Sequence, residues 1–523
     1  MTKHLPAEPA PSSMSKAQRG IGMILCLLTI VLAILDQNIV SSAVVPIVRD
    51  LDPVHGIDHV AWLVAAFALG ATAMLPLYGR LCDVLGAKQV YLAAIATFLT
   101  GSVLCGAAQS MTQLIAFRAI QGIGAGGLMS VTMVVMAHLR EPGDKSGPGG
   151  LAGLIAGIGM AVGPLVGGLF ADHGNWRWIF YINVPLGLVI IAGAVWALRF
   201  PRHTARASID FLGASLAAGF TCALLLVCEW GGTRYAWDSP VIVVLVTAAV
   251  AGLGLFLWRQ ATAAQPILPL SLFRIPTVRT GYVIQGLVGV AMMGAMIYLM
   301  IYLQVARGVS STSAGAYLAF MAIGMTFSGL LDGRLGWSTR TGMATGTGCF
   351  AIALGALACT TVDTSLWLVR GELVLLGIGL GQLLGKLIVV VQQAAPPHQL
   401  GVATTGIRFF QNLGGTIGAA AFGSLLSRVF EARTGGLLVS GIAHLAPAAR
   451  PAAVASFVAS VDVVFAVAAA VMTVAFLFAV RLREAPQDTT PAEAPRRPGA
   501  DQPPATAPRS GTVPAEEQTL PVG

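Results

Sequence analysis

The stretch GIGMAVGPLVGG, from Gly157 to Gly168, has almost no polar side chains and repeats glycine at every fourth position. Gly159, Gly163 and Gly167 therefore share one face of a predicted helix. A face without side chains lets a neighbouring helix pack at backbone contact. Pro164 removes a backbone donor in mid-helix, which a membrane helix tolerates where neighbours bond to the freed carbonyl. The stretch predicts a hinge or tight packing seam in a helical membrane protein; ordinary close packing in a bundle is the alternative.

The composition of the whole chain also indicates a membrane protein. Of its 523 residues, 56% are hydrophobic and only 10% are charged, whereas about 25% are charged in soluble proteins. Apolar runs of about 18 residues or more, long enough to cross a bilayer as a helix, recur along most of the chain. The alternating segments typical of an outer-membrane barrel are absent from the sequence. We predict an all-α polytopic membrane protein that lies in a lipid bilayer.

We predict fourteen membrane spans. They cover residues 21–45, 60–78, 89–108, 112–136, 150–171, 179–198, 209–229, 240–258, 280–303, 313–331, 341–361, 366–390, 401–426 and 456–480. With an even number of spans and a cytosolic start, most of the 31 Lys and Arg residues lie in cytosolic segments, as the positive-inside rule requires. Both termini are therefore expected in the cytosol. Arg far outnumbers Lys, and Ala and Gly abound, which indicates a GC-rich bacterial genome and so a bacterial cytoplasmic membrane.

Two six-span blocks flank a two-span insert, which is typical of a duplicated transporter bundle. We divide the chain into a cytosolic head (1–20), an N-terminal six-helix bundle (21–198), basic linkers with two extra helices (199–279), a C-terminal six-helix bundle (280–482) and a disordered tail (483–523). We expect a monomer. The positive charge of the loops is explained by topology, so no nucleic-acid partner is expected.

Two ionisable residues in the apolar spans are the main candidates for chemistry, because such groups are costly in a membrane and usually functional. Asp36 lies near the middle of the first span, beside Gln37 and Asn38. It could load and release a proton, because a low dielectric favours a neutral carboxyl group. Arg118, in the fourth span, stays charged and needs an acceptor. The alternatives are a helix-to-helix hydrogen bond for Asp36 and a static ion pair for Arg118.

Other polar residues in the spans have weaker assignments. The uncharged candidates for lining a substrate cavity are Gln37, Asn38, Gln121, Gln285 and Gln304. Glu372, in the twelfth span, is a further cavity candidate, although a local pair with Arg370 is the simpler interpretation. We expect Arg408 to snorkel towards the inner surface, and we expect Asp462 to cap the last span.

The motifs taken together identify a family. GRLCDVLGAKQ from Gly79, RAIQGIGAGG from Arg118, the glycine stretch from Gly157, NWRWIFYINVPLG from Asn175 and IYLQVARGVSSTSAG from Ile301 resemble those of the major facilitator superfamily, and within it the fourteen-span drug:proton antiporters. The resemblance covers residues 20–482. It implies proton coupling through Asp36 and Arg118, and a bending seam at Gly159, Gly163, Pro164 and Gly167.

The loop motif GRLCDVLGAKQ is expected to hold the cytosolic side closed. Gly79, Asp83, Gly86 and Lys88 fit the family pattern, whereas Ala87 stands where the family commonly has a basic residue. Physically, glycine allows the tight turn, and Asp83 can meet a helix N-terminus or an arginine.

Two other positions depart from the family pattern. In the first span Asn38 and Val45 stand where Thr and Pro are usual, with Pro46 one residue late. In the thirteenth span Gln411 stands where the family often has Arg, and Arg408 lies one turn earlier.

These features predict a secondary active exporter of an amphipathic small molecule, such as an antibiotic, driven by proton entry and alternating access. A same-fold exporter of an endogenous metabolite is the first alternative, a nutrient importer the second and a membrane sensor the third. The sequence has no GxxxxGK[ST] loop, no HExxH, no nucleophile elbow and no CxxC pair among its seven cysteines. We therefore expect no enzyme activity, no metal and no cofactor apart from the coupling proton.

Overall fold

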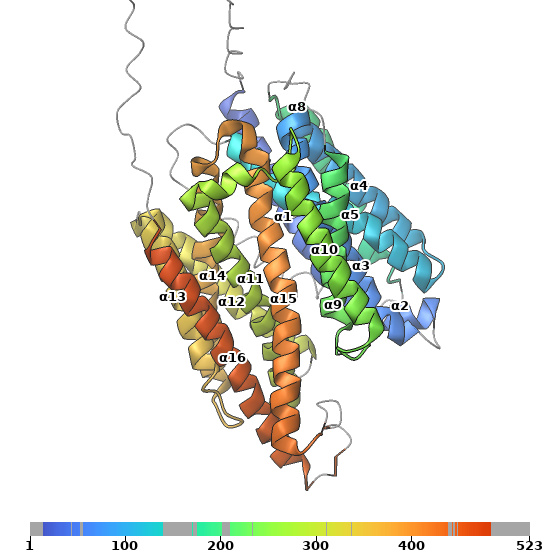
Figure 1. Ribbon diagram of the computed structural model, residues 1–523, viewed down its shortest axis with the longest axis vertical. Helices are drawn as coiled ribbons and strands as arrows, with labels where there is room; N and C mark the ends of the chain where they lie inside the picture. The colour runs from blue at the N-terminus through green and yellow to red at the C-terminus, as the bar shows by residue number, and fades with distance from the viewer. Residues whose placement is uncertain are drawn as a thin grey trace, which may run out of the picture. The chain divides into compact units, whose positions relative to one another are not determined.

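The apolar runs of the sequence form a bundle of helices in the computed structural model (Figure 1). The structure describes residues 14–42, 44–52, 56–139, 170, 175–200, 210–232, 234–309, 311–335, 337–437, 442, 445–446 and 448–482. Within these residues the chain is helical and has no strand, so the all-α fold class is confirmed. The predicted tail, and the glycine stretch Gly157–Gly168 with Gly159, Gly163, Pro164 and Gly167, lie outside them.

The helices follow the predicted spans closely. They are α1 (Lys16–Ser42), α2 (Val44–Leu51), α3 (Gly56–Leu85), α4 (Ala87–Ala107), α5 (Met111–Leu139), α7 (Trp178–Tyr181), α8 (Asn183–Ala197), α9 (Phe211–Trp230), α10 (Pro240–Thr262), η1 (Leu270–Arg274), α11 (Pro276–Ile301), η2 (Tyr302–Ala306), α12 (Ser311–Leu335), α13 (Thr339–Leu357), α14 (Leu366–Ala394), η3 (Pro397–Gln399), α15 (Leu400–Thr434) and α16 (Arg450–Val480).

In the part of the chain that the structure describes, eleven helices are long and apolar enough to cross a membrane. Helices α12 and α13 occupy two further predicted spans. The fifth predicted span, 150–171, lies outside the described residues except for Phe170. The fold class is therefore established, whereas the count of fourteen spans stays a prediction.

Polar side chains at loop ends start several of these helices. Asp210, Ser239, Ser338 and Ser365 each accept a hydrogen bond from a backbone N–H in the first turn of α9, α10, α13 and α14. Such bonds satisfy donors that have no partner within the helix. The helix starts are thus encoded locally, next to the apolar runs.

Glycines bring α3, α4 and α5 into backbone contact. A Cβ atom on Gly122 or Gly126 would overlap the carbonyl oxygen of Phe67 or Ala71 in α3. One on Gly124 would overlap the backbone of Phe98 in α4. The glycines of RAIQGIGAGG are therefore a close-packing device, and they hold Arg118, at the start of that motif, deep in the bundle.

The inserted helices α9 and α10 lie side by side on the outside of the bundle (Figure 1). Helix α9 packs against α3 through Trp230 and Trp62, whose ring centroids are 5.3 Å apart. It packs against α15 through Phe220 and Phe409. Helix α10 instead exposes large apolar side chains; Val250 and Trp258 are 67% and 61% exposed. Such a surface suits contact with lipid.

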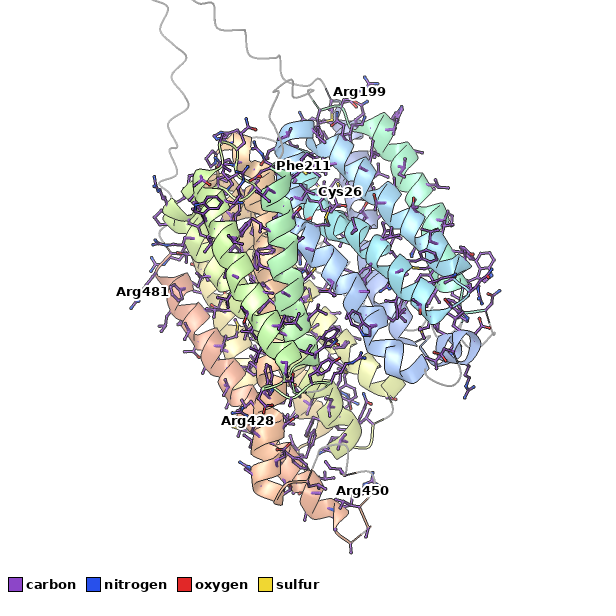
Figure 2. All side chains as sticks on the ribbon, turned by 45° about the vertical axis from the view of Figure 1, so that its right-hand side comes forward. Cys26, Arg199, Phe211, Arg428, Arg450 and Arg481 are labelled. Atoms are coloured by element: carbon purple, nitrogen blue, oxygen red, sulfur yellow. The ribbon has the colours of Figure 1, made fainter. Side chains whose placement is uncertain are left out.

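The last helix begins earlier than we predicted. Helix α16 starts at Arg450 with Pro451 in its first turn, so Asp462 lies well inside it and does not cap it. The residues before Asp462 are mostly Ala, Val and Ser, and proline suits a first turn because its missing N–H is not needed there. Arg450 lies at the end of the helices opposite to Arg199 and Arg481 (Figure 2).

An ion pair outside the spans joins α2 to the segment before α7. The Asp50 carboxylate accepts hydrogen bonds from Arg177, at 2.6 Å, and from the Trp176 indole, at 3.0 Å. These hydrogen bonds hold the pKa of Asp50 below its ordinary value. A lowered pKa adds stability at neutral pH that is lost as the pH falls through it.

We expect Asp50→Asn to lower stability at pH 7 by at most about 1 kcal/mol, because exposed ion pairs contribute little. The difference from the wild type should shrink as the pH falls below the ordinary aspartate pKa of about 4 and vanish below the lowered pKa of the folded protein. Thermal unfolding in detergent between pH 3 and pH 7 measures both. A deficit of the same size at pH 3 and at pH 7 would contradict the assignment to charge.

Candidate functional site

The two charged residues singled out in the sequence form an ion pair that is buried among the N-terminal helices. Asp36 on α1 is 0% exposed and Arg118 on α5 is 2% exposed. The Arg118 Nη1 donates to Asp36 Oδ2 at 3.2 Å. The guanidinium also lies 4.0 Å from the ring centroid of Phe67, and its Nε donates to the Leu63 carbonyl at 3.4 Å. Asp36 therefore faces neither lipid nor open water.

Amide and hydroxyl groups complete the surroundings of Asp36. Its Oδ1 accepts from Gln121 Nε2 and from Asn183 Nδ2, each at 2.8 Å. Both amides also donate to the Ser102 hydroxyl, at 3.1 and 2.9 Å, and Ser102 donates to the Phe180 carbonyl at 2.9 Å. We call Asp36, Arg118, Gln121, Asn183 and Ser102 the buried polar cluster. It joins helices α1, α4, α5 and α8.

This arrangement is suited to holding a carboxylate that can change its charge. A buried ion is stable only when it is paired and its remaining lone pairs are satisfied. Asp36 meets both conditions, through one arginine and two amides. Removing the charge of either partner would leave the other unbalanced in a low dielectric, so proton uptake by Asp36 would alter hydrogen bonds in a cluster that joins four helices.

The remaining cavity candidates are not part of the buried polar cluster. Gln285 on α11 is 2% exposed, and Gln37 and Gln304 have exposed side chains. Gln121, which we also predicted to line a cavity, is 0% exposed and bonds to Asp36 instead. The Asn38 side chain lies outside the described residues. Substrate contact at these positions stays a prediction.

The expected local pair between Arg370 and Glu372 does not form. Arg370 lies 4.2 Å from the Trp367 ring centroid, and its Nη2 donates to the Tyr317 hydroxyl at 3.4 Å. Glu372 is 6% exposed, and its Oε2 has no hydrogen-bond partner among the described residues. Residues two apart on a helix point to different sides, so this pairing was wrong. Arg408 bonds to Gln411, at 2.9 Å.

A second group of predicted residues connects the two ends of the chain. Asp83, in the last turn of α3, accepts from the backbone N–H of Gly401 at 2.6 Å and of Val402 at 3.1 Å. These are first-turn donors of α15, whose own flanking residue Gln399 supplies no side-chain cap. A carboxylate suits the positive end of a helix dipole. Asp83 thus caps a helix more than 300 residues away in sequence, as one of its two predicted partners.

The other residues of that motif allow this approach. A Cβ atom on Gly79 would lie 2.8 Å from the Val402 Cα, closer than real contacts permit. Gly86 has φ +92°, which favours glycine. Lys88 donates to the carbonyls of Val195 and Leu198 at the C-terminus of α8, at 2.9 and 2.6 Å, where a cation is favourable. The motif therefore caps the N-terminus of α15 through Asp83 and the C-terminus of α8 through Lys88.

Two further hydrogen bonds join the first helices to the last. Gln392 Nε2 donates to the Met133 carbonyl at 3.3 Å, and Asn412 Nδ2 donates to Thr72 at 3.2 Å. Like Asp83, Met133 and Gln392 lie near the helix ends that we predict to face the cytosol. We call the contacts of Asp83 with Gly401 and Val402 the cytosolic clasp, after this predicted side.

We expect Asp83→Ala to loosen the cytosolic clasp. Loss of a helix cap costs about 1 kcal/mol, which raises the open population about fivefold. Cys82 is 4% exposed and contacts Gly401, so its thiol reports on the clasp. In a chain that keeps only this cysteine, its alkylation by a membrane-impermeant maleimide should accelerate about fivefold. Asp238→Ala, an exposed loop variant, is the control; equal rates in both would contradict the clasp.

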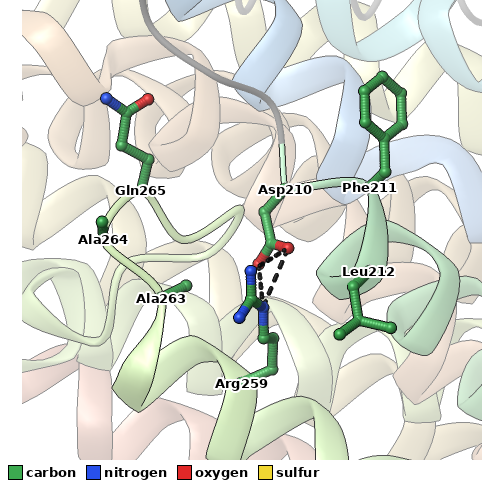
Figure 3. Close-up of a pocket in the computed structure, with 7 residues that line it drawn as sticks. All are labelled: Asp210, Phe211, Leu212, Arg259, Ala263, Ala264 and Gln265. Carbon is green, nitrogen blue, oxygen red and sulfur yellow. Dashed lines mark hydrogen bonds and ion pairs between the residues drawn. The ribbon is translucent and has the colours of Figure 1, made fainter.

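The pocket drawn in Figure 3 lies where the inserted helices meet their linkers. Asp210, before α9, forms an ion pair with Arg259 near the end of α10, with Nε–Oδ1 and Nη2–Oδ1 distances of 3.0 Å. Gln265, in the linker after α10, accepts from Arg80 of the loop motif at 2.9 Å. The ion pair joins the start of α9 to the end of α10, and Arg259 balances the charge of the Asp210 carboxylate.

Two members of the buried polar cluster were not predicted from the sequence. Asn183 lies within NWRWIFYINVPLG, and Ser102 lies in an apolar run. Both are fully buried. A signal was present for Asn183, because it is an amide within a predicted span, but it was not among the amides singled out.

Comparison with known protein families decides which class this helix bundle belongs to. The model of the Major Facilitator Superfamily matches residues 26–419. The chain belongs to the Major Facilitator Superfamily. It is therefore a multi-pass membrane transporter of small molecules rather than an enzyme.

Relatives within the superfamily agree with this assignment. An uncharacterized MFS-type transporter of Mycobacterium tuberculosis is 34% identical over 491 residues, covering 90% of this chain and 71% of the relative. The multidrug transporter protein MdtP of Bacillus subtilis is 33% identical over 77% of this chain and 74% of its own length. An MFS-type efflux pump of Arthroderma benhamiae is 30% identical over 82% and 80%.

Solved structures show the same fold at low sequence identity. The human organic anion transporter MFSD10 aligns with a TM-score of 0.59 at 15% identity, over 88% of this chain and 99% of that one. A POT family peptide transporter aligns with a TM-score of 0.54 at 17% identity, over 91% and 99%. These likenesses concern the superfamily fold alone.

Proposed function

We propose that this transporter exports amphipathic organic compounds, such as a drug or antibiotic, in exchange for protons. The observation that carries the proposal is the ion pair of Asp36 and Arg118, which is buried from solvent among the N-terminal helices. A carboxylate in that position can alternate between a paired, charged form and a protonated, neutral form. The multidrug and efflux names of relatives at 30–33% identity support export rather than uptake.

Proton entry supplies enough free energy for this task. One proton that crosses 100 mV releases about 2.3 kcal/mol, which sustains roughly a fortyfold gradient of a neutral substrate. The two six-helix bundles would rock about a central cavity, with the cytosolic clasp closing one side and the seam at Gly159, Gly163, Pro164 and Gly167 bending. The transporter would work as a monomer in a bacterial cytoplasmic membrane, with both termini in the cytosol.

Proton release from acidified inverted vesicles tests the proposal. A panel of lipophilic compounds is added to vesicles that contain the transporter, and the internal pH is followed with a fluorescent dye. We expect alkalinisation with at least one compound, and none in vesicles without the protein. Compound movement that continues at the same rate after the pH and voltage differences are collapsed would overturn the exchange mechanism. Compound uptake into intact cells that rises with expression of the transporter would favour an importer.

A further inference from the structure

We propose that Asn183 is a positioning residue that serves Asp36 in both of its protonation states. Its amide N–H donates to the ionised carboxylate, and its amide oxygen accepts from the protonated carboxyl group. The inference deepens the proposed function, because it takes Asp36 as the proton-binding group. It rests on a count of donors and acceptors in the buried polar cluster.

In the ionised state the amide groups of Gln121 and Asn183 and the Ser102 hydroxyl all donate to acceptors. Asp36 Oδ1 receives the amides of Gln121 and Asn183, and Oδ2 receives Arg118. The Ser102 hydroxyl accepts from the same two amides and donates to the Phe180 carbonyl, so both of its lone pairs are used. The cluster is therefore complete around a negative charge.

A proton on Asp36 changes this count, because a neutral carboxyl group must donate a hydrogen bond. Gln121 Oε1 already accepts from Arg118 Nη1 at 2.7 Å and from the Cys105 thiol at 3.6 Å. Asn183 Oδ1 is buried and has no partner among the described residues. Asn183 Oδ1 and Nδ2 are bonded to the same carbon, and Nδ2 lies 2.8 Å from Asp36 Oδ1.

A half-turn of the Asn183 amide would exchange the two atoms. The oxygen would then face the new proton, and the nitrogen would move to the place where the amide has no partner among the described residues. The Ser102 hydroxyl, no longer accepting from Asn183, could rotate its hydrogen to a new acceptor. An unmade hydrogen bond at a buried polar atom is costly, so the amide should present to Asp36 whichever of its two atoms matches the protonation state of the carboxyl group. Arginine and glutamine cannot play this part, since Arg118 has no acceptor and Gln121 is held by Arg118.

The groups that face Asp36 leave few other partners for a proton. Helix α5 contributes the charged Arg118 and α4 contributes the Cys105 thiol. Helix α3 contributes the Leu63 carbonyl, which Arg118 occupies, and α8 contributes Asn183. Within the described helices around the cluster, Arg118 and Cys105 are thus the titratable groups besides Asp36.

Infrared titration of the purified, reconstituted full chain tests the inference. The C=O band of protonated Asp36 is identified by its absence in Asp36→Asn. In Asn183→Leu the band should appear about one pH unit higher, because the lost bond to the charged form is about twice as strong as the lost bond to the neutral form. The band should also move to higher frequency, because the carboxyl group donates a weaker hydrogen bond. Asn183→Ala removes the same atoms and should behave alike if the leucine variant folds poorly.

Gln382→Leu is the matched control. Gln382 is another buried amide with an orphan oxygen, but it lies on α14, remote from Asp36, and donates to the Ser328 carbonyl. It should leave the Asp36 band unchanged. An unchanged band in both Asn183 variants, an equal shift in the control, or no Asp36 band at any pH would overturn the inference. A shift confined to the Asn183 variants, in a protein that releases no protons from vesicles, would support the inference and overturn the exchange mechanism instead.

Discussion

Asp36→Asn is expected to abolish proton-coupled efflux while the protein remains folded in the membrane. Asparagine has nearly the shape of aspartate, and its oxygen can still accept from Asn183 and Gln121, but it binds no proton at neutral pH. Arg118 keeps its bonds to Gln121 and Leu63 and its contact with Phe67, which limits the cost of its unbalanced charge. The roughly fortyfold accumulation that one proton can sustain should fall to equality across the membrane.

Substrate accumulation and proton release in energised inverted vesicles measure this loss. The amount of folded protein is checked by size-exclusion chromatography in detergent. Asp238→Asn, in the exposed loop between α9 and α10, removes a carboxylate outside the cluster and should transport like the wild type. Full pH-dependent extrusion by Asp36→Asn would exclude Asp36 from proton coupling.

The fold class could be predicted from the sequence because long apolar runs, which indicate membrane helices, recur along most of the chain. Each apolar run is followed by a polar break, and residues such as Asp210 and Ser365 mark helix starts next to those runs. The position of α16 was less predictable. Small apolar residues before Asp462 suit a helix as well as a loop, so the sequence contained no sharp boundary there.

The candidate site was predictable only in part. A charge inside an apolar run is conspicuous, so Asp36 and Arg118 could be found, and a glycine-rich loop made Asp83 conspicuous too. Their geometry depends on packing between helices that are distant in sequence, such as α3 with α15. Neutral Asn183 and Ser102 carry no charge to mark them, and their importance is visible only where four helices meet.

Arg118→Leu is expected to remove proton release and to make stability fall as the pH rises. Without the guanidinium, Asp36 keeps two amide donors but has no opposite charge, and an unpaired buried carboxyl group keeps its proton instead of ionising. The folded variant then binds one proton more than the unfolded chain above the ordinary aspartate pKa of about 4. Stability therefore decreases by about 1.4 kcal/mol for each pH unit, up to the roughly 3–5 kcal/mol that an uncompensated buried charge costs.

The double variant Asp36→Asn/Arg118→Leu separates the ion pair from the fold. It has no carboxyl group to protonate at this position. The position should therefore add no pH dependence to the thermal stability between pH 5 and pH 8. The Arg118→Leu single variant should lose stability over the same range. Replacing a buried pair by neutral groups is often tolerated, whereas breaking it is costly. The double variant should thus be more stable than Arg118→Leu at pH 8 and equally inactive. Equal pH dependence in the single and double variants would show that Asp36 is not the group that Arg118 keeps ionised.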